Sequence, residues 1–358
     1  MDVGDELIKK PRLVRGFLFG ISMRRLLIFG NGLGKAIDLN HFELKNAMQA
    51  VWDDPAILSQ SQKDLINACI PKEENSQYTA PSSEDELDLL HSITFNCTLI
   101  QNVSRKLKHS SGWLTEEGKK FPNAVSRYMH EVATHLYLYP GTLPKNFTEP
   151  LIKFIRITKS HVATLNYDKL LYDALSTGDL LQPYYSETTL VDGFNKYGFN
   201  PSNLERRNGN SFGYYLHLHG SPLFHDTENF TQKINRNELT KNGATHSNHI
   251  VLSHVKHKPT IIKSSSILYE YWKKLRECID ESKEIFLVGY SGCDYHLNNL
   301  ISKAPNETPI RIIEWGDPEA KNRIHYWSSL LPGKNITVNP YPNILEFDKW
   351  DMQVTHKI

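Results

Sequence analysis

Four short hydrophobic runs in this sequence end in small, hydroxyl, amide, imidazole or acidic side chains. These are Thr164, Asn166 and Asp168 after residues 161–165, His219 after 214–218, Gly289, Ser291 and Asp294 after 284–288, and Glu314 after 309–313. An imidazole titrates near pH ~6.5 when unperturbed, so it can accept a proton at neutral pH, and such general-base help is worth roughly 10²–10⁴-fold in rate. A neutral amide can hold a hydroxyl group or a water molecule without adding charge. Asp294 is also a good helix N-cap before the run H-L-N-N-L-I.

A glycine-rich turn follows another hydrophobic run. The stretch L-L-I-F-G-N-G-L-G-K-A-I-D, from Leu26, places Gly30, Gly32 and Gly34 within five residues. Glycine costs roughly 1 kcal/mol relative to alanine inside a helix, so the three predict a turn where Cβ atoms would obstruct a close approach of the backbone. Such a turn after the first strand of a parallel sheet usually faces a phosphate. The spacing G-x-G-x-G is not the dinucleotide pattern G-x-G-x-x-G, so a tight turn without a ligand stays open as an alternative.

The hydrophobic runs themselves are predicted to be buried strands, because they are short, continuous and bounded by glycine or polar residues. They are residues 25–29, 161–165, 214–218, 284–288 and 309–313, with 334–338 expected at a sheet edge. Helices are expected at 33–39, from about 167, and at 294–303. Strands that alternate with helices indicate an α/β fold, a Rossmann-like doubly wound parallel sheet. The strand ends of such a sheet share one crevice.

Residues 43–157 differ in character, since their apolar residues recur at helical spacing. We expect an inserted helical subdomain there, with a capping box formed by Ser83 and Glu86. Its aromatic residues either offer a contact surface for a partner or fill the core of the subdomain itself. They are Trp52, Phe95, Trp113, Phe121 and Tyr128.

The rest of the chain divides around this insertion. Residues 23–42 and 158–358 are expected to form the sheet domain, and residues 1–22 an N-terminal extension. The segment 184–211 is rich in Asn, Gly, Ser and Tyr and is predicted to be a long functional loop.

Composition excludes several classes of protein. The 358 residues include 41 basic and 40 acidic side chains, a net charge of +1, which disfavours nucleic-acid binding as the main task. No stretch approaches the ~18 apolar residues of a membrane span. The four cysteines are scattered without a C-x-x-C pair, so we expect no ribbon-type zinc site and a reducing, cytoplasmic location.

Four motifs, in order, resemble the nucleotide-binding core of sirtuins. They are G-N-G-L-G at 30–34, T-L-N-Y-D at 164–168, H-G at 219–220 and G-Y-S at 289–291, and the resemblance covers roughly 24–42 and 158–345. It implies that NAD⁺ is bound as substrate. The residues that the resemblance assigns to this binding are Gly30, Asn31, Gly32, Gly34, Asp38, Thr164, Gly289, Ser291 and Glu314.

Two departures separate the chain from sirtuin deacylases. It lacks their four-cysteine zinc module, and in place of a D-F-R segment it has only Asp38 and Phe42. The chain is more similar to bacterial sirtuin-like proteins of anti-phage defence that consume NAD⁺, above all those paired with a HerA-type ATPase. The resemblance therefore implies a homo-oligomer whose activity is controlled by assembly with such an ATPase.

The implied reaction is hydrolysis of NAD⁺ to nicotinamide and ADP-ribose through a cationic, oxocarbenium-like state. Asn166 would hold the ribose hydroxyl or the attacking water, His219 would accept a proton, and Asp168 would bond the carboxamide or brace the site. A sensor that binds NAD⁺ or ADP-ribose without cleaving it is the alternative, and a protein deacylase is a weaker one.

The histidine-rich segment at 246–257 allows two interpretations. His246, His249, His254 and His257 follow the spacing H-x₂-H-x₄-H-x₂-H, which could ligate zinc. We favour a segment that covers the nucleotide, with His254 or Lys256 on a phosphate, and expect no metal.

Overall fold

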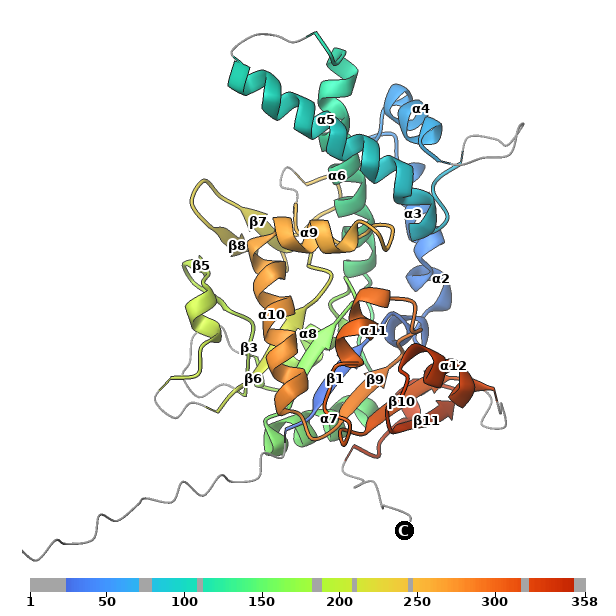
Figure 1. Ribbon diagram of the computed structural model, residues 1–358, viewed down its shortest axis with the longest axis vertical. Coiled ribbons are helices and arrows are strands. Elements are labelled where there is room, and N and C mark those ends of the chain that lie inside the picture. Colours follow the sequence, from blue (N-terminus) through green and yellow to red (C-terminus); the bar gives the residue numbers. More distant parts are fainter. Residues whose placement is uncertain are drawn as a thin grey trace, which may run out of the picture.

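The core of the protein is a seven-stranded sheet in which every pair of neighbours is parallel (Figure 1). The computed structural model describes residues 24–70, 79–107, 112–181, 189–207, 211–243, 247–316 and 322–350. The strand order is β11-β10-β9-β1-β2-β6-β3. The strands are β1 (Leu26–Phe29), β2 (His161–Thr164), β3 (Leu190–Val191), β6 (Gly213–His217), β9 (Ile285–Val288), β10 (Ile310–Trp315) and β11 (Ile336–Tyr341). The predicted Rossmann-like doubly wound parallel sheet is confirmed.

Strand β1 lies between β2 and β9, so the chain reverses its direction of winding beside it. Leu26 pairs with His161 on one side and with Ile285 on the other. In doubly wound sheets, ligands bind at the carboxyl ends of the strands where the order reverses. The end of β1, occupied by the glycine-rich turn, is therefore the expected floor of a binding site.

Both faces of the sheet are covered. Leu27 and Phe29 point into one hydrophobic cluster and Leu26 and Ile28 into the other, as the period of two along a strand requires. The first face packs against α1 (Gly32–Lys35), α7 (Lys145–Thr158) and α8 (Leu170–Thr177), and the second against α10 (Ser266–Glu281), α11 (Tyr295–Ile301) and α12 (Arg323–Leu330). Burial on two faces explains why the strands are continuous apolar runs.

The segment predicted to be one long loop contains short elements. Besides β3 it holds β4 (Phe194–Asn195), β5 (Gly198–Phe199) and the 3₁₀ turn η2 (Pro201–Leu204), while β7 (Phe224–Asp226) and β8 (Thr231–Lys233) follow β6. Strands of two residues are too short to show a pattern in the sequence.

Helices fill the chain between β1 and β2. They are α2 (Leu39–Phe42), α3 (Leu44–Trp52), α4 (Gln60–Ala68), the 3₁₀ turn η1 (Glu84–Leu87), α5 (Asp88–Leu107), α6 (Glu116–Tyr137) and α7. Figure 1 shows α3 to α6 gathered at one end of the molecule, whereas α7 lies beside the sheet. Phe154 of α7 packs edge-on against Phe286 of β9, with ring centroids 6.0 Å apart. The domain limits drawn at residues 42 and 158 stay a prediction, and residues 1–22 lie outside the described residues.

Two details of the insertion bear on the predictions made for it. The predicted capping box is wrong: Ser83 makes no capping bond, and Glu86 instead accepts from the amide and hydroxyl of Ser82 at 2.7 Å and 2.6 Å. Some of the aromatic residues fill the core of the subdomain, and others are exposed, as a contact surface would require. Trp52, Phe121 and Tyr128 are buried, while Phe95 and Trp113 are more than half exposed.

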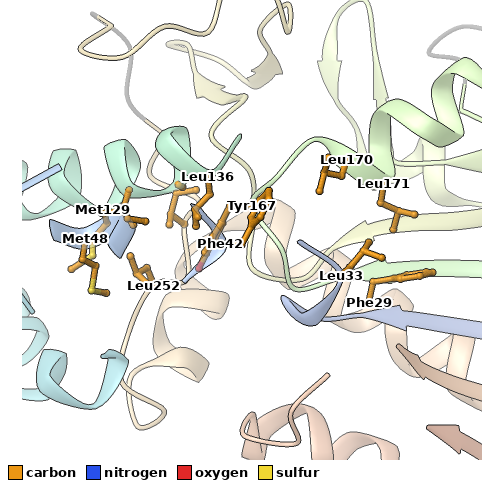
Figure 2. Packing of buried hydrophobic residues seen from close by; sticks show 14 of the residues in the cluster. Phe29, Leu33, Phe42, Met48, Met129, Leu136, Tyr167, Leu170, Leu171 and Leu252 are labelled. Carbon is orange, nitrogen blue, oxygen red and sulfur yellow. The ribbon is translucent and has the colours of Figure 1, made fainter. Parts of the chain in front are cut away.

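The insertion and the sheet share one hydrophobic core. Figure 2 shows Met48, Met129 and Leu136 of the insertion on one side and residues of the sheet unit on the other, with Phe42 and Tyr167 between them. The segment that carries Leu252 joins the same cluster. The insertion is thus fixed against the carboxyl end of β1 by apolar contacts.

The glycine-rich turn packs directly against the backbone that follows β9. A Cβ atom on Gly30 or on Gly32 would lie 2.7 Å from the carbonyl oxygen of Gly289. The amide of Gly32 donates to that oxygen at 2.8 Å. Gly289 has a φ of +59°, a left-handed conformation that favours glycine. The glycines are therefore required by the close approach of two strand ends.

We expect Gly289→Ala to lower the free energy of unfolding by about 2–4 kcal/mol, because it combines left-handed strain with a steric clash. The new Cβ would lie 2.8 Å from the amide nitrogen of Leu33. Gly333→Ala is the matched control: its φ is +74°, but among the described residues no atom lies within 4 Å of the added Cβ. It should cost only about 1 kcal/mol. Urea unfolding measures both, and equal losses would contradict the importance of the contact.

Candidate active site

A cavity of about 430 Å³ opens at the carboxyl ends of the central strands, a volume within the usual range for small-molecule sites. Most of the residues selected from the sequence lie in its wall. These are Gly30, Asn31, Gly32, Asn166, Asp168, His219, Gly289, Ser291 and Glu314. The insertion also lines the cavity, through Leu44, Glu84 and Leu136. Phe42, Leu252 and Lys258, the first residue of α9 (Lys258–Ser264), line it as well.

Three of the predicted binding residues do not line this cavity and have local roles instead. Gly34 leaves room for the ring of Phe42, whose atoms would lie 2.6 Å from an added Cβ. The carboxylate of Asp38 caps α2 by accepting from the amide of His41 at 2.9 Å. The hydroxyl of Thr164 accepts from the amide of Asn166 at 3.0 Å. Asp38 and Thr164 thereby shape the turns that carry or adjoin the site.

The amide of Asn166 is held in place on one side only. Its Nδ2 donates to the carbonyl of Gly30 at 3.1 Å, which ties the end of β2 to the glycine-rich turn. Its Oδ1 is buried and, among the described residues, has no hydrogen-bond partner. A buried acceptor without a partner is costly unless a ligand or water satisfies it. Asn166 therefore offers the cavity an oriented acceptor.

His219 pairs with a carboxylate that the sequence presented as a helix cap. Asp294 does cap α11, because its Oδ1 accepts from the amide of Leu297 at 3.0 Å. Its Oδ2 lies 3.0 Å from Nε2 of His219. With the carboxylate as acceptor, Nε2 carries the hydrogen and Nδ1 keeps its lone pair, so the imidazole can take up a proton there.

Asp294 is kept ionised by its neighbours. Burial acts to raise its pKa, but the hydrogen bond from His219 and the charge of Lys258 hold that pKa well below its usual range. The loop before it is rigid, since the hydroxyl of Tyr290 donates to Asn298 Oδ1 at 2.8 Å and accepts from the amide of Asp294 at 3.0 Å. The carboxylate is thus a fixed negative charge beside the imidazole.

Lys258 and Glu84 are functional candidates that sequence reasoning missed. The Nζ atom of Lys258 lies 3.2 Å from Asp294 Oδ2 and 3.0 Å from Glu84 Oε2. Burial acts to lower the pKa of Lys258, but the two carboxylates raise it above its ordinary value, so the side chain stays charged. No local pattern indicated this contact, because the two segments are distant in sequence.

Asp168 is a buried carboxylate in the same wall. Burial raises its pKa to about 6, although the amide of Leu170 donates to its Oδ1 at 2.9 Å. Raised pKa values of this kind are common at functional sites. The ring of Tyr167, which precedes it, lies 6.4 Å from that of His219, centroid to centroid.

The cavity has a second polar end at the carboxyl end of β10. Both oxygens of Glu314 already accept hydrogen bonds, from Arg323 at 2.7 Å and 2.5 Å and from Trp327 Nε1 at 2.9 Å. A ribose at this end would have to share that carboxylate with Arg323. Nearby, the hydroxyl of Ser291 accepts from the amide of Cys293 at 3.4 Å and keeps its own hydrogen to donate.

The amides of Gly30, Gly32 and Gly289, which were expected to face a phosphate, are paired within the protein. Gly30 N–H donates to the carbonyl of Val288 at 2.9 Å, and Gly289 N–H to that of Ile313 at 2.8 Å, as Gly32 N–H does to Gly289. The close approach of the strand ends consumes these donors. The glycines serve the cavity by leaving its floor free of side chains.

The histidine-rich segment reaches the cavity through other residues than predicted. His246 lies outside the described residues. Lys256 and His257 pair with Asp88, at 2.7 Å and 2.8 Å, and His249 lies 2.7 Å from Ser265 Oγ. Of the described residues of the segment, only Leu252 lines the cavity, so the contact of His254 or Lys256 with a phosphate stays a prediction.

One group of possible metal ligands occurs elsewhere, His161, Cys278 and Glu281, with ligand atoms within 4.8 Å of one another. Nδ1 of His161 already accepts from the amide of Tyr214 at 3.1 Å, and Nε2 lies 2.7 Å from Glu281. Both ring nitrogens thus have protein neighbours, and the absence of a metal stays a prediction. No helix in the described parts of the chain is long and apolar enough to cross a membrane.

Comparison with known families supports a sirtuin-like assignment. Residues 160–328 match the family model described as SIR2-like domain. This range contains Asn166, Asp168, His219 and Asp294, while the glycine turn and Glu84 lie outside it. SIR2-like domains use NAD⁺, so the match fits an NAD-dependent activity. No curated protein matched the chain.

We expect Asp168→Asn to stabilise the protein at pH 7–8, by up to about 3 kcal/mol. Because the folded-state pKa of Asp168 is about 6, above the ~3.9 of an unfolded chain, its contribution to stability is present at low pH and lost as pH rises through 6. The gain in melting temperature should therefore stay level from pH 8 to about 7 and shrink as pH falls from about 6 towards 4. Asp64→Asn, on the exposed face of α4, is the control. A gain that does not vary with pH would contradict the buried ionisation.

Proposed function

We propose that the protein is an NAD⁺ glycohydrolase, which cleaves NAD⁺ to nicotinamide and ADP-ribose. The observation that carries the proposal is the convergence of three features on one cavity. They are the Asn166 acceptor, which has no partner in the described part of the chain, the imidazole–carboxylate pair of His219 and Asp294, and a floor of glycines. The match to a SIR2-like domain supports NAD⁺ as the molecule bound.

In the reaction, the bond between the nicotinamide nitrogen and the ribose carbon breaks and its electron pair returns to the pyridine ring. A water oxygen bonds to the same ribose carbon, and the proton that the water loses passes to Nδ1 of His219 and then to solvent. Asn166 Oδ1 would accept from the water or a ribose hydroxyl and orient it. The charge of Asp294 stabilises the imidazolium that forms.

The fit to a dinucleotide rests on side chains more than on backbone donors. Ser291 keeps a hydroxyl hydrogen for a diphosphate oxygen, and Arg323 adds a guanidinium at the same end of the cavity. Lys35 also lines the cavity, where its ammonium pairs with Glu43 at 2.6 Å. These cations can bind phosphate oxygens by exchanging a carboxylate partner.

We further propose that the enzyme acts in anti-phage defence by depleting NAD⁺, as a homo-oligomer under the control of a HerA-type ATPase. An NAD⁺ hydrolase that is always active would exhaust its own cell, so its activity must depend on assembly or a signal. Phe95 and Trp113, exposed on the insertion, support a contact surface there. Sequencing of the neighbouring gene and co-purification test the partner.

Release of nicotinamide from NAD⁺, followed by chromatography with and without the candidate ATPase, tests the activity. Asn166→Ala and His219→Ala should each lower the rate by 100-fold or more, roughly the worth of an oriented hydrogen bond or a general base. Asn299→Ala and His325→Ala are matched controls, exposed on α11 and α12, and should retain the wild-type rate.

Binding separates the alternatives. Wild-type protein that binds NAD⁺ in calorimetry but releases no nicotinamide under any condition would contradict the proposal and indicate a sensor. Release that requires an acylated peptide would indicate a deacylase.

A further inference from the structure

A chain of charged groups joins the helical insertion to the imidazole of His219. Oδ2 of Asp294 lies 3.0 Å from Nε2 of His219 and 3.2 Å from Nζ of Lys258, and that Nζ lies 3.0 Å from Oε2 of Glu84. The side chains of Lys258 and Asp294 are nearly buried, and that of Glu84 is 29% exposed. The proposed reaction assigns no role to Glu84 or Lys258.

We infer that Glu84 and Lys258 are positioning residues that set the proton affinity of His219, so that the insertion tunes the general base. The inference rests on the function proposed above. Under this inference the insertion contributes the charge of Glu84 to the site, in addition to apolar side chains.

The signs of the charges decide what each residue does. Because the 3.0 Å and 3.2 Å contacts share one oxygen, the imidazole and ammonium nitrogens lie within about 6 Å of each other. At that distance a cation disfavours protonation of the imidazole. Glu84 offsets the cation. With Asp294, the three groups sum to one negative charge, which one imidazolium neutralises.

The turn that carries Glu84 is well anchored. Leu87 of η1 is fully buried, and Ser82 donates two hydrogen bonds to Glu86. A fixed element thus places the carboxylate of Glu84 beside Lys258. Any change in the position of η1 would change the electrostatic field at His219.

Other titratable groups face the same region and are left unchanged by the test. Asp168 and Tyr167 come from the loop after β2, and His296 comes from α11. Burial raises the pKa of Tyr167 well above its ordinary value and lowers that of His296, so both are neutral at neutral pH. Differences between variants therefore report the charges of Glu84 and Lys258.

Glu84→Gln and Lys258→Gln should shift the acidic limb of the pH profile of kcat/KM in opposite directions, each by about 0.5–1 pH unit. Loss of the carboxylate leaves the ammonium uncompensated and moves the limb to lower pH. Loss of the ammonium of Lys258 leaves the two carboxylates of Glu84 and Asp294 and moves the acidic limb to higher pH. The double variant restores a net charge of minus one, so its profile should return close to that of the wild type.

Asp88→Asn and Lys256→Gln are matched controls. Their side chains pair at 2.7 Å in the neighbouring positions of the same two segments, outside the cavity. Both should leave the profile unchanged. A merely structural role would not shift the profile in opposite directions in the two variants. Shifts in the same direction in Glu84→Gln and Lys258→Gln, or no shift in either, would therefore overturn the inference.

A second measurement does not depend on catalysis. NMR titration of imidazole-labelled protein, with the His219 signal assigned by its loss in His219→Gln, should show the same opposite shifts of midpoint. If the wild type releases nicotinamide but the midpoints coincide, the inference fails and the proposed function stands. If the midpoints shift but no nicotinamide is released, the proposed function fails and the coupling stands.

Discussion

The site depends on one contact, the approach of the turn after β1 to the backbone after β9. Gly30, Gly32 and Gly289 meet there with no room for a Cβ, and a hydrogen bond joins the two segments. The carbonyl of Gly30 then holds the amide of Asn166. The loop that leaves Gly289 ends at Asp294, the partner of His219. Asn166 and the carboxylate that pairs with His219 are thus positioned from the same junction.

Charge inside the cavity is balanced by pairing. Lys35, Lys258 and Arg323 each contact a carboxylate of this chain. Burying an unpaired charge costs far more free energy than burying an ion pair. Truncation of one partner therefore leaves the other as a costly unpaired charge. Two residues that line the cavity each have a buried oxygen without a partner among the described residues, Oδ1 of Asn166 and the hydroxyl of Tyr167.

The helical insertion contributes to the environment of the cavity. Its Leu136 lines the cavity of His219 and Asp294 together with Phe42 and Leu252 from outside the insertion, and electrostatic interactions are stronger in such apolar surroundings than in water. Because the insertion shares its hydrophobic core with the sheet, a displacement of its helices would alter this apolar lining and the position of Glu84 together. The same contacts that stabilise the fold therefore govern the environment of His219.

The sequence by itself determined the strands, their parallel arrangement and the polar side chains at their ends. These follow from short apolar runs, from alternation with helices and from motifs of neighbouring residues, which local patterns encode. The sequence did not predict helix α10 or strand β3, and the two residues of β3 are too few to carry a period.

Only the tertiary structure decided which groups are free and which are paired. The amides of Gly30 and Gly32 are consumed because the end of β9 approaches them, and Glu84 of η1 reaches Lys258 at the start of α9. Asp294 serves as both cap and partner for the same reason, since its second oxygen faces another strand end. Such pairings depend on how segments far apart in the chain cross in space, which no pattern of neighbouring residues records.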